Sequence, residues 1–538
     1  MSIESVKEYF NTHLLISTHA RYLLFLIGFG LFSLLFNLGG RSLENKDTVS
    51  HPEIAREILE TGDWVMLRQN GTIYVDKPPL HFWLAAISYT IFGVSPFAAR
   101  IPEAAAAFTG ILLCYFFTRR ILGNSETAFL AAIILLSAIG YLWWGRRTRS
   151  DIEFSIFFAM SLIFFYYGCE TDGKKTKAVW YATFWLATGC AFMTKAFVAF
   201  TNLAVVIPYG IMIMLKPEGR RVSPLLWVMT GPFLAVPVLP WILSLWRHTD
   251  FSQYWDIFEK ANIATRDGGL FHYLGDLPIK LFPGIPFMLV GLWAFVTFRK
   301  QLLERRNLGF VFLWFGSYFF ILHLTIVKDT RYLIPIYLPC SIISAWAITF
   351  LTGRHPVRFS RIMRYTDRIF FIAATLGLTI PFFFAYFHRV ALLAPWPYVV
   401  CLGLVLLLTR KLLPVKAGGI FVSFIILFLS IEAGDAVVDK KMATFRQISQ
   451  TLKEHGLSPE EVALFNCANS RREQSALSFY YNQLIDCSDG FNGLLKDPKV
   501  KAVVVERKFL HDTSWRQIQQ KYRIIQFRKG YLVIIKSK

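Results

Sequence analysis

The sequence is poor in charge, since only 17% of its 538 residues are Asp, Glu, Lys or Arg, whereas about 25% is usual for soluble proteins. Hydrophobic residues make up 54% of the chain and aromatic residues 16%, and the mean hydropathy is +0.44. This composition excludes an intrinsically disordered chain, a secreted disulfide scaffold and a soluble nucleic-acid binder. No nucleic-acid partner is therefore expected.

Several common motifs are also missing. The sequence has no Walker-type loop, no HExxH motif, no CxxC pair and no internal repeat. No cofactor is predicted, and a requirement for a divalent cation stays open. Five of the seven cysteines lie in apolar runs, where a thiol acts as a small hydrophobic group. Cys467 and Cys487 lie near the C-terminus, where a disulfide and two free thiols are both open alternatives.

Long apolar runs predict a polytopic all-α membrane protein. A helix needs roughly 20 apolar residues to cross the hydrocarbon core. About thirteen runs qualify as spans, near residues 22–38, 97–118, 127–144, 153–169, 178–195, 197–215, 224–246, 281–298, 308–327, 332–352, 369–387, 391–409 and 418–433. The apolar run Leu80–Phe92 is too short to span and is expected to form an interfacial helix.

The net charge of +21 would suggest nucleic acid in a soluble protein, but here it reflects topology. Basic linkers alternate along the chain with linkers that are acidic, mixed or very short. If the spans alternate in direction, every basic linker lies on one side, which the positive-inside rule identifies as the cytoplasm. The linkers 39–80, 146–151, 247–280 and 328–331 are then outside.

The sequence from residue 434 to 538 is mixed in polarity and predicts a small α/β domain. Expected strands are Val462–Phe465, Ala502–Val505, Ile524–Phe527 and Tyr531–Ile535, with a hairpin turn at 528–530. Expected helices are Thr444–His455, Ser475–Tyr481 and Ser514–Gln520. An odd number of spans in residues 1–433 places this domain outside.

The outer linkers contain cations that break the positive-inside rule. Asp47 and Lys77 lie within the first outer linker. The second contains Arg146, Arg147, Arg149 and Asp151, and a later one contains Lys328 and Arg331, followed by Tyr332. Cations at the outer headgroup level suit the phosphate of a lipid. Solvated loop charges, a helix N-cap at Asp151 and interfacial anchors remain open alternatives.

Particular motifs resemble a known family. The first outer loop carries Glu53-Ile54-Ala55-Arg56-Glu57, Gly62-Asp63-Trp64, Asn70-Gly71, Tyr74 and Lys77-Pro78-Pro79-Leu80, and later come Arg149-Ser150-Asp151 and Arg331-Tyr332-Leu333-Ile334-Pro335. These runs resemble the aminoarabinose transferases that modify lipid A, within the protein O-mannosyltransferase-like glycosyltransferases of the GT-C fold. The resemblance extends to about residue 340 and implies thirteen spans, interfacial helices in the loop 39–96 and an outer C-terminal domain.

The resemblance also implies roles for individual residues. Asp47 and Asp151 match the catalytic acidic positions. Lys77, Arg331 and Tyr332, joined by Arg149 and Lys328, are expected to bind the donor phosphate. Apart from the resemblance, Glu53, Arg56 and His51 are expected to position the acceptor, and a solvated surface histidine is an open alternative for His51. The family usually has Asp-Glu-x-Arg-Tyr where this chain has Asp47-Thr48-Val49-Ser50-His51, and often has Glu where this chain has Asp76.

The expected function is transfer of a sugar from a polyprenyl (undecaprenyl) phosphate to a lipid A or lipopolysaccharide acceptor. The site and the C-terminal domain would face the periplasm of a bacterial inner membrane, with membrane lipids as further partners. A protein O-glycosyltransferase of the same fold differs only in acceptor. A flippase for lipid-linked sugars is disfavoured, since transporters place binding charges near the bilayer midplane and in repeated halves.

Overall fold

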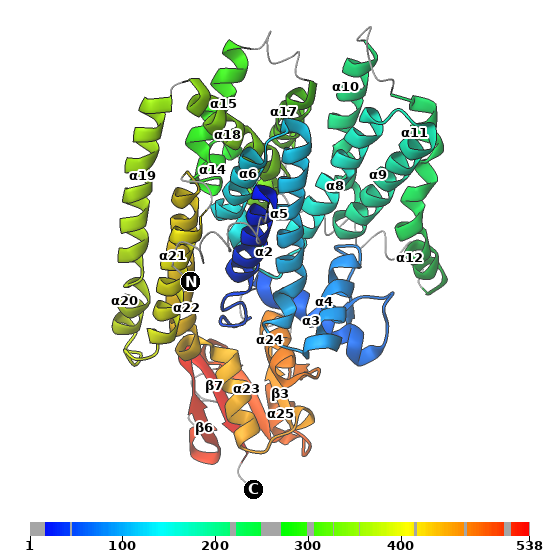
Figure 1. The fold of residues 1–538 in the computed structure, drawn as a ribbon. Helices are drawn as coiled ribbons and strands as arrows, with labels where there is room; N and C mark the ends of the chain where they lie inside the picture. Colours follow the sequence, from blue (N-terminus) through cyan, green and yellow to red (C-terminus); the bar gives the residue numbers. More distant parts are fainter. Residues whose placement is uncertain are drawn as a thin grey trace, which may run out of the picture.

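The computed structural model describes residues 17–43, 46–215, 222–248, 269, 271–298, 306–325, 328–354, 356–413, 417–466, 471–510 and 518–536, without the side chains of 46–48, 306, 440–442 and 529. A bundle of long helices forms one end of the molecule, and a small domain with a β-sheet forms the other (Figure 1). The predicted fold class, a helical membrane region followed by an α/β domain, is confirmed.

Every predicted span coincides with helical structure. The bundle contains α2 (Thr18–Leu35), α5 (Ile101–Leu122), α6 (Ser125–Ser137), α7 (Ile139–Trp144), α8 (Asp151–Glu170), α9 (Lys174–Lys195), α10 (Leu203–Met214), α11 (Pro224–Met229), α12 (Ala235–His248), α14 (His272–Lys280), α15 (Ile285–Thr297), α17 (Arg306–Leu324), α18 (Ile334–Arg354), α19 (Pro356–Gly377), α20 (Ile380–Phe387), α21 (Trp396–Leu412) and α22 (Gly418–Met442).

The number of helices that meet length and hydropathy criteria is lower than thirteen. Within the described residues nine qualify, or ten if the bent pair α14 and α15 is one span. Lys174–Met214 counts once, although its 41 residues would extend about 60 Å, twice the hydrocarbon thickness. Two other predicted spans are too short, because α6 has 13 residues and α21 has 17. The chain is a multi-pass membrane protein.

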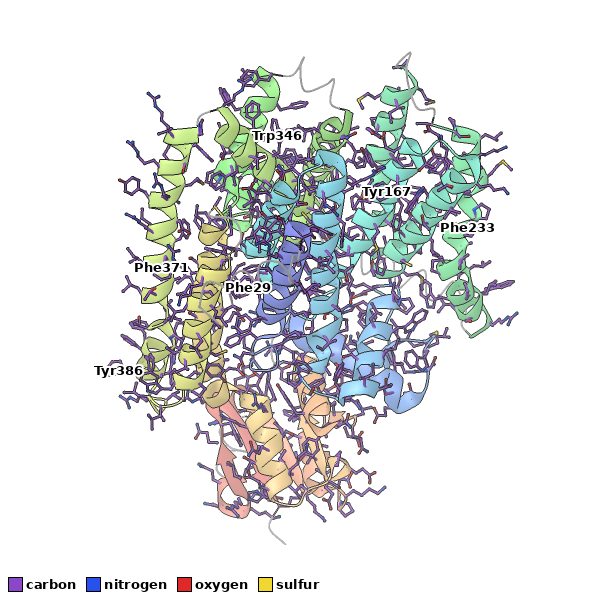
Figure 2. The ribbon with its side chains drawn as sticks, in the orientation of Figure 1. Phe29, Tyr167, Phe233, Trp346, Phe371 and Tyr386 are labelled. Atoms are coloured by element: carbon purple, nitrogen blue, oxygen red, sulfur yellow. The ribbon has the colours of Figure 1, made fainter. Side chains whose placement is uncertain are left out.

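Large apolar side chains cover the outer surface of the bundle. Phe233 and Tyr386 lie at the edges of the bundle (Figure 2). The side chain of Phe233 is 48% exposed and that of Tyr386 is 70% exposed. A soluble protein rarely exposes so much apolar surface, so this surface fits contact with lipid.

The first predicted outer loop folds into α3 (Lys46–Thr61), a hairpin of β1 (Arg68–Gln69) and β2 (Thr72–Ile73), and α4 (Leu80–Phe92). The predicted short helix therefore has the bounds expected for it. Asn70 and Gly71 form the hairpin turn with positive φ angles of 54° and 75°, conformations that Asn and Gly tolerate best. The Glu57 carboxylate accepts both of their backbone N–H groups, at 2.5 and 3.0 Å.

A buried arginine links residues one turn apart within α3. The Arg56 guanidinium donates to both Glu53 carboxylate oxygens at 2.9 and 2.8 Å, and to Glu60 at 2.9 Å. Arg56 is 2% exposed and Glu53 is fully buried. Such a pair has to be complete, because either charge alone would be buried without compensation.

The C-terminal domain is a five-stranded sheet in the order β4-β3-β5-β7-β6. Strands β3 (Val462–Phe465), β5 (Ala502–Glu506), β6 (Arg523–Gln526) and β7 (Tyr531–Ile535) match the predicted strands, and the short β4 (Asp486–Ser488) and α25 (Phe491–Lys496) were not predicted. Strand β3 pairs in parallel with β4 and β5, and β7 pairs antiparallel with β5 and β6.

Helices α23 (Thr444–Glu454) and α24 (Arg471–Tyr481) of the same domain confirm two predicted helices, whereas most of the predicted helix 514–520 lies outside the described residues. Cys487 takes part in a disulfide bond, and Cys467 is outside the described residues.

The first outer loop and the C-terminal domain share one hydrophobic core. Its buried members include Val49, Ile54 and Phe82 from the loop, and Phe445 and Phe479 from the domain. Polar contacts add to this core, because the Asn70 amide donates to the Arg471 carbonyl at 2.8 Å and the Tyr480 hydroxyl accepts from the Leu43 N–H at 2.8 Å. In Figure 1, α3 and α4 accordingly lie beside α24, between the bundle and the sheet. The loop is therefore a packed layer.

The Arg56 pair allows a test of this packing. Replacing Arg56 with Met leaves the buried Glu53 carboxylate without its partner, and we expect a loss of about 3–5 kcal/mol in the free energy of unfolding. Thermal unfolding in detergent measures the change. Arg68→Met, at a partly exposed arginine of the same loop, is the matched control and should change stability little. Equal stability of the two variants would contradict the assigned role of Arg56.

Candidate functional site

The buried carboxylate of Asp151 lies beside cations from distant parts of the chain. Asp151 is the first residue of α8 and is 2% exposed. Lys195, the last residue of α9, forms an ion pair with its Oδ1. Arg331, in the short helix η4 (Thr330–Leu333), places Nη1 at 3.8 Å from its Oδ2. All three groups thus lie at the ends of helical segments, which the packing of the bundle brings together.

Lys77 extends this cationic group from the first outer loop. Its ammonium lies 3.1 Å from His51 Nε2. Burial is the largest cause that lowers the pKa of Lys77, to about 7, and Arg149, Lys195 and Arg331 lower it further against the opposing effect of Asp151. The four cations Lys77, Arg149, Lys195 and Arg331 outnumber the two carboxylates that pair with them, Asp151 and Asp329. We call this cluster of four cations around Asp151 the pocket, and its net positive charge favours an anion.

Aromatic rings and a second carboxylate orient the cations. Tyr332 places its ring 5.0 Å from Lys195 Nζ, and Trp144 places its ring 5.9 Å from the Arg331 guanidinium. The Arg331 side chain also donates from Nε to Asp329 Oδ1 at 2.8 Å. These contacts leave Arg331 with little freedom to move, which suits binding of a planar or tetrahedral anion in one geometry.

The structure brings some of the predicted residues together at this pocket. They are Asp151, Lys77, Arg331, Tyr332 and His51, and Arg149, which is 8% exposed, acts electrostatically on both Lys77 and His51. Burial and the neighbouring Lys77 lower the pKa of His51 well below its ordinary value. His51 is therefore a neutral imidazole beside the lysine.

Three other predicted cations, Lys328, Arg146 and Arg147, bind groups of the protein outside this pocket. Lys328 donates to the carbonyl oxygens of Leu322, His323 and Thr325, at 3.3, 3.1 and 2.8 Å. It thus caps the C-terminal end of α17, where free carbonyls and the helix dipole attract a cation.

The first two arginines of the second linker are also used internally. Arg146 donates to the carbonyl oxygens of Ser33, Leu34 and Phe36, at 2.7, 3.0 and 2.7 Å. Arg147 lies 3.4 Å from Glu432 and 4.0 Å from the Trp143 ring. Both arginines therefore join α2 and α22 to the segment before α8.

Two of the predicted acceptor residues, Glu53 and Arg56, lie in the buried pair within α3 and not at the pocket. Asp47 belongs to α3, but its side chain lies outside the described part of the chain. Position 47 is one helical turn before His51, and residues four apart lie on the same helix face. That face carries the contact between His51 and Lys77.

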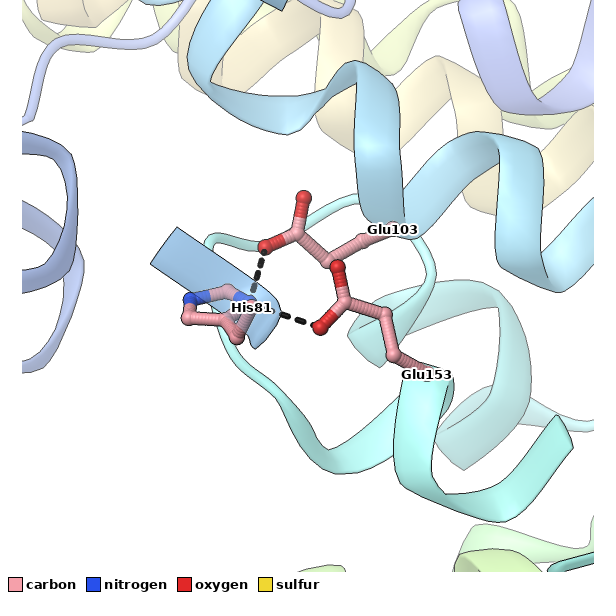
Figure 3. A group of neighbouring side chains, drawn as sticks. All are labelled: His81, Glu103 and Glu153. Atoms are coloured by element: carbon pink, nitrogen blue, oxygen red, sulfur yellow. Dashed lines mark hydrogen bonds and ion pairs between the residues drawn. The ribbon is translucent and has the colours of Figure 1, made fainter. Parts of the chain in front are cut away.

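Sequence reasoning missed a group of ionisable residues behind the pocket. His81 of α4 places Nδ1 at 2.7 Å from Glu153 Oε2 of α8 and at 3.7 Å from Glu103 Oε1 of α5 (Figure 3). The other ring nitrogen, Nε2, lies 2.9 Å from His51 Nδ1. Among the described residues, these three form a group with the ligand types and spacing for a metal ion.

A signal for these residues was present in the sequence. Glu103 and Glu153 lie inside predicted spans and Lys195 lies between two of them, and an ionisable residue within an apolar segment usually marks a functional site. The expectation of a lipid phosphate at the headgroup level favours the linkers and not these positions. His81 gave no such signal, since it begins an apolar helix as an isolated polar residue.

Comparison with known proteins relates this geometry to a family. Residues 76–243 match the model of the family "Dolichyl-phosphate-mannose-protein mannosyltransferase". Undecaprenyl phosphate-alpha-4-amino-4-deoxy-L-arabinose arabinosyl transferase 2 of Pseudomonas fluorescens is 27% identical over 66% of this chain and 60% of its own length. The corresponding transferase of Aeromonas salmonicida is 32% identical over 42% of this chain and 41% of its own length. The matches therefore span less than two thirds of these relatives.

A solved structure gives a longer match. ArnT from Cupriavidus metallidurans bound to undecaprenyl phosphate aligns with a TM-score of 0.71 and 20% identity, covering 95% of this chain and 97% of that protein. The two proteins share a fold over almost their whole lengths. The predicted resemblance to aminoarabinose transferases, with its GT-C fold, is confirmed.

The low pKa of Lys77 is testable by chemical labelling. An ammonium group reacts with amine reagents only after it loses its proton, so the labelling rate of Lys77 should rise with a midpoint near pH 7. Quantitative mass spectrometry of the intact chain in nanodiscs gives the midpoint. The exposed Lys175 of the same chain is the control and is labelled in parallel.

The variant Asp151→Asn tests the cause of the pKa of Lys77. The Asp151 carboxylate raises the pKa of Lys77, so Asp151→Asn should move the labelling midpoint to lower pH. A midpoint near pH 10 for Lys77, or no response to Asp151→Asn, would contradict the electrostatic account of the pocket.

Proposed function

We propose that this chain is an integral membrane glycosyltransferase. It transfers a sugar from undecaprenyl phosphate to a lipid A or lipopolysaccharide acceptor. The observation that carries the proposal is the convergence of Lys77, Lys195 and Arg331 on the buried carboxylate of Asp151. The curated relatives, named as undecaprenyl phosphate-aminoarabinose transferases, support the identity of the donor.

The excess of positive charge serves the leaving group. When the glycosidic bond breaks, the lipid phosphate leaves as an anion, so it needs charge stabilisation more than it needs a proton. Lys77 and Arg331 supply that charge from two sides, with Arg149 nearby. Tyr332 lies beside Lys195 and borders the same space. Lys328, which caps α17, contributes no direct contact in this account.

The acceptor side of the reaction is assigned to the start of α3. The sugar C1 becomes positively charged and oxocarbenium-like as the phosphate leaves. A carboxylate at position 47 then activates an acceptor hydroxyl as a general base, or orients an acceptor phosphate that is already anionic. His51, one turn later, contacts Lys77 and thus connects the acceptor side to the donor phosphate.

The topology follows from the charges of the linkers. We infer that the pocket and the C-terminal domain (434–538) face the periplasm, and that the membrane region (1–433) lies in a bacterial inner membrane. The basic linkers then face the cytoplasm, as the positive-inside rule requires. The shared core of the first outer loop and the C-terminal domain supports their location on one side.

A protein acceptor is the second candidate. The match of residues 76–243 to the protein mannosyltransferase family model favours it, because that region includes Lys77, Asp151 and Lys195. The donor chemistry is the same in both reactions. The acceptor alone distinguishes them.

One experiment separates the candidates. Purified protein in nanodiscs is incubated with undecaprenyl-phosphate sugars and with either lipid A or peptide acceptors, and the products are weighed by mass spectrometry. A mass increase of one sugar on lipid A supports the first proposal, and an increase on the peptides supports the second. If the donor is consumed but neither lipid A nor a peptide gains the mass of a sugar in any mixture, both proposals are refuted.

Asp47→Asn tests the acceptor side. A positioned general base contributes about 10²–10⁴-fold to rate, so we expect kcat to fall by that factor while expression, membrane insertion and donor binding persist. Asp63→Asn, a carboxylate in the same loop, is the control and should retain activity. Near-normal turnover by Asp47→Asn would remove Asp47 from the mechanism.

The pH dependence of donor binding tests Lys77. Below pH 7 its ammonium is already charged, so affinity should be independent of pH. Above pH 7 the free protein has to take up a proton when the phosphodiester binds, and affinity should fall roughly tenfold per pH unit. The measurement is binding of an undecaprenyl-phosphate sugar in nanodiscs. In Lys77→Arg the charge is permanent, so the slope should disappear; an unchanged slope would assign it to another group.

A further inference from the structure

The residues behind the pocket have no role in the transfer reaction described above. His81, Glu103 and Glu153 come from α4, α5 and α8, and Figure 3 shows both carboxylates turned toward the imidazole ring. Their side chains are 2%, 0% and 1% exposed. One potential ligand atom from each lies within 4.8 Å of the others.

Within the described part of the chain, hydrogen bonds satisfy only one of the four carboxylate oxygens, Glu153 Oε2, which lies 2.7 Å from His81 Nδ1. Both oxygens of Glu103 and Oε1 of Glu153 are buried without a hydrogen-bond partner among the described residues. Two carboxylates that lose their hydration in one small space repel each other, and such groups persist in proteins only with a cation or bound protons. The group therefore needs a positive charge from outside its own side chains.

We propose that His81, Glu103 and Glu153 bind a divalent transition-metal ion of the zinc class. Tetrahedral coordination at zinc bond lengths separates neighbouring ligand atoms by about 3.3 Å. The observed separations of His81 Nδ1 from the two carboxylates, 2.7 and 3.7 Å, bracket this value. A nitrogen ligand with two carboxylates favours zinc or manganese over calcium and magnesium, which prefer oxygen alone.

The rest of the histidine supports the same assignment. A metal-bound histidine usually directs its second ring nitrogen to a hydrogen-bond partner that fixes the ring. Here His81 Nε2 lies 2.9 Å from His51 Nδ1. The metal ligand is thus held by the residue that contacts Lys77.

The ion would hold in place the helices that carry the residues of the donor pocket. Lys77 lies four residues before His81, and Asp151 lies two residues before Glu153. An ion that joins α4, α5 and α8 fixes the two sides of the pocket relative to each other. His81 is accordingly a positioning residue.

Metal content tests the proposal directly. The full-length chain, purified without a metal-affinity resin, is measured in nanodiscs by inductively coupled plasma mass spectrometry. We expect one zinc-class ion per chain, lost in Glu103→Gln and in Glu153→Gln. Glu170→Gln, at the other end of α8, is the matched control and retains the ion.

A second measurement uses the wild-type chain, so that folding of a variant does not decide the result. Chelation should lower the midpoint of thermal unfolding, Zn²⁺ should restore it, and Co²⁺ should give the visible absorption of a bound ion. The absence of a stoichiometric ion, together with a midpoint that neither chelator nor Zn²⁺ changes, would overturn the proposal and leave the carboxylates protonated. Sugar transfer is assayed separately, so a bound ion in an inactive protein would refute only the transferase proposal.

Discussion

The burial of charge in an apolar bundle is the constraint on which the pocket depends. Asp151 is 2% exposed, and an isolated carboxylate at that depth would cost several kcal/mol. Lys195 and Arg331 compensate it, but together with Arg149 and Lys77 they exceed its charge. The same arrangement that stabilises the carboxylate therefore leaves the pocket with a net positive charge that favours an anion. Burial first, and the neighbouring cations second, lower the pKa of Lys77.

The pocket is assembled from rigid parts. Asp151, Lys195 and Arg331 lie at ends of helical segments, so their Cα positions follow from the packing of the bundle. Lys77 is held differently, because it belongs to a loop that shares a core with the C-terminal domain. That domain thus contributes to the site through the packing of α3 and α4.

Much of the architecture was predictable, because hydropathy determines it locally. The predicted short helix Leu80–Phe92 has the bounds of α4, and strands β3 and β7 have the bounds predicted for them. The candidate site was predicted less completely. Lys77, Asp151 and Arg331 converge as expected, but sequence position could not distinguish Arg149 from Arg146, since both are arginines of one linker. Only the fold directs Arg146 to the carbonyl groups of α2.

The sequence by itself determined the membrane region, the α/β domain and the linkers that contain the site, since these follow from apolar run length, alternation and local charge. Tertiary structure alone decided which charges meet. Lys195 is 44 residues from Asp151 along the chain, and His81, Glu103 and Glu153 lie on three helices. No local pattern encodes such contacts, because they arise when helices pack and each buried charge has to be compensated by whatever group the neighbouring helix presents.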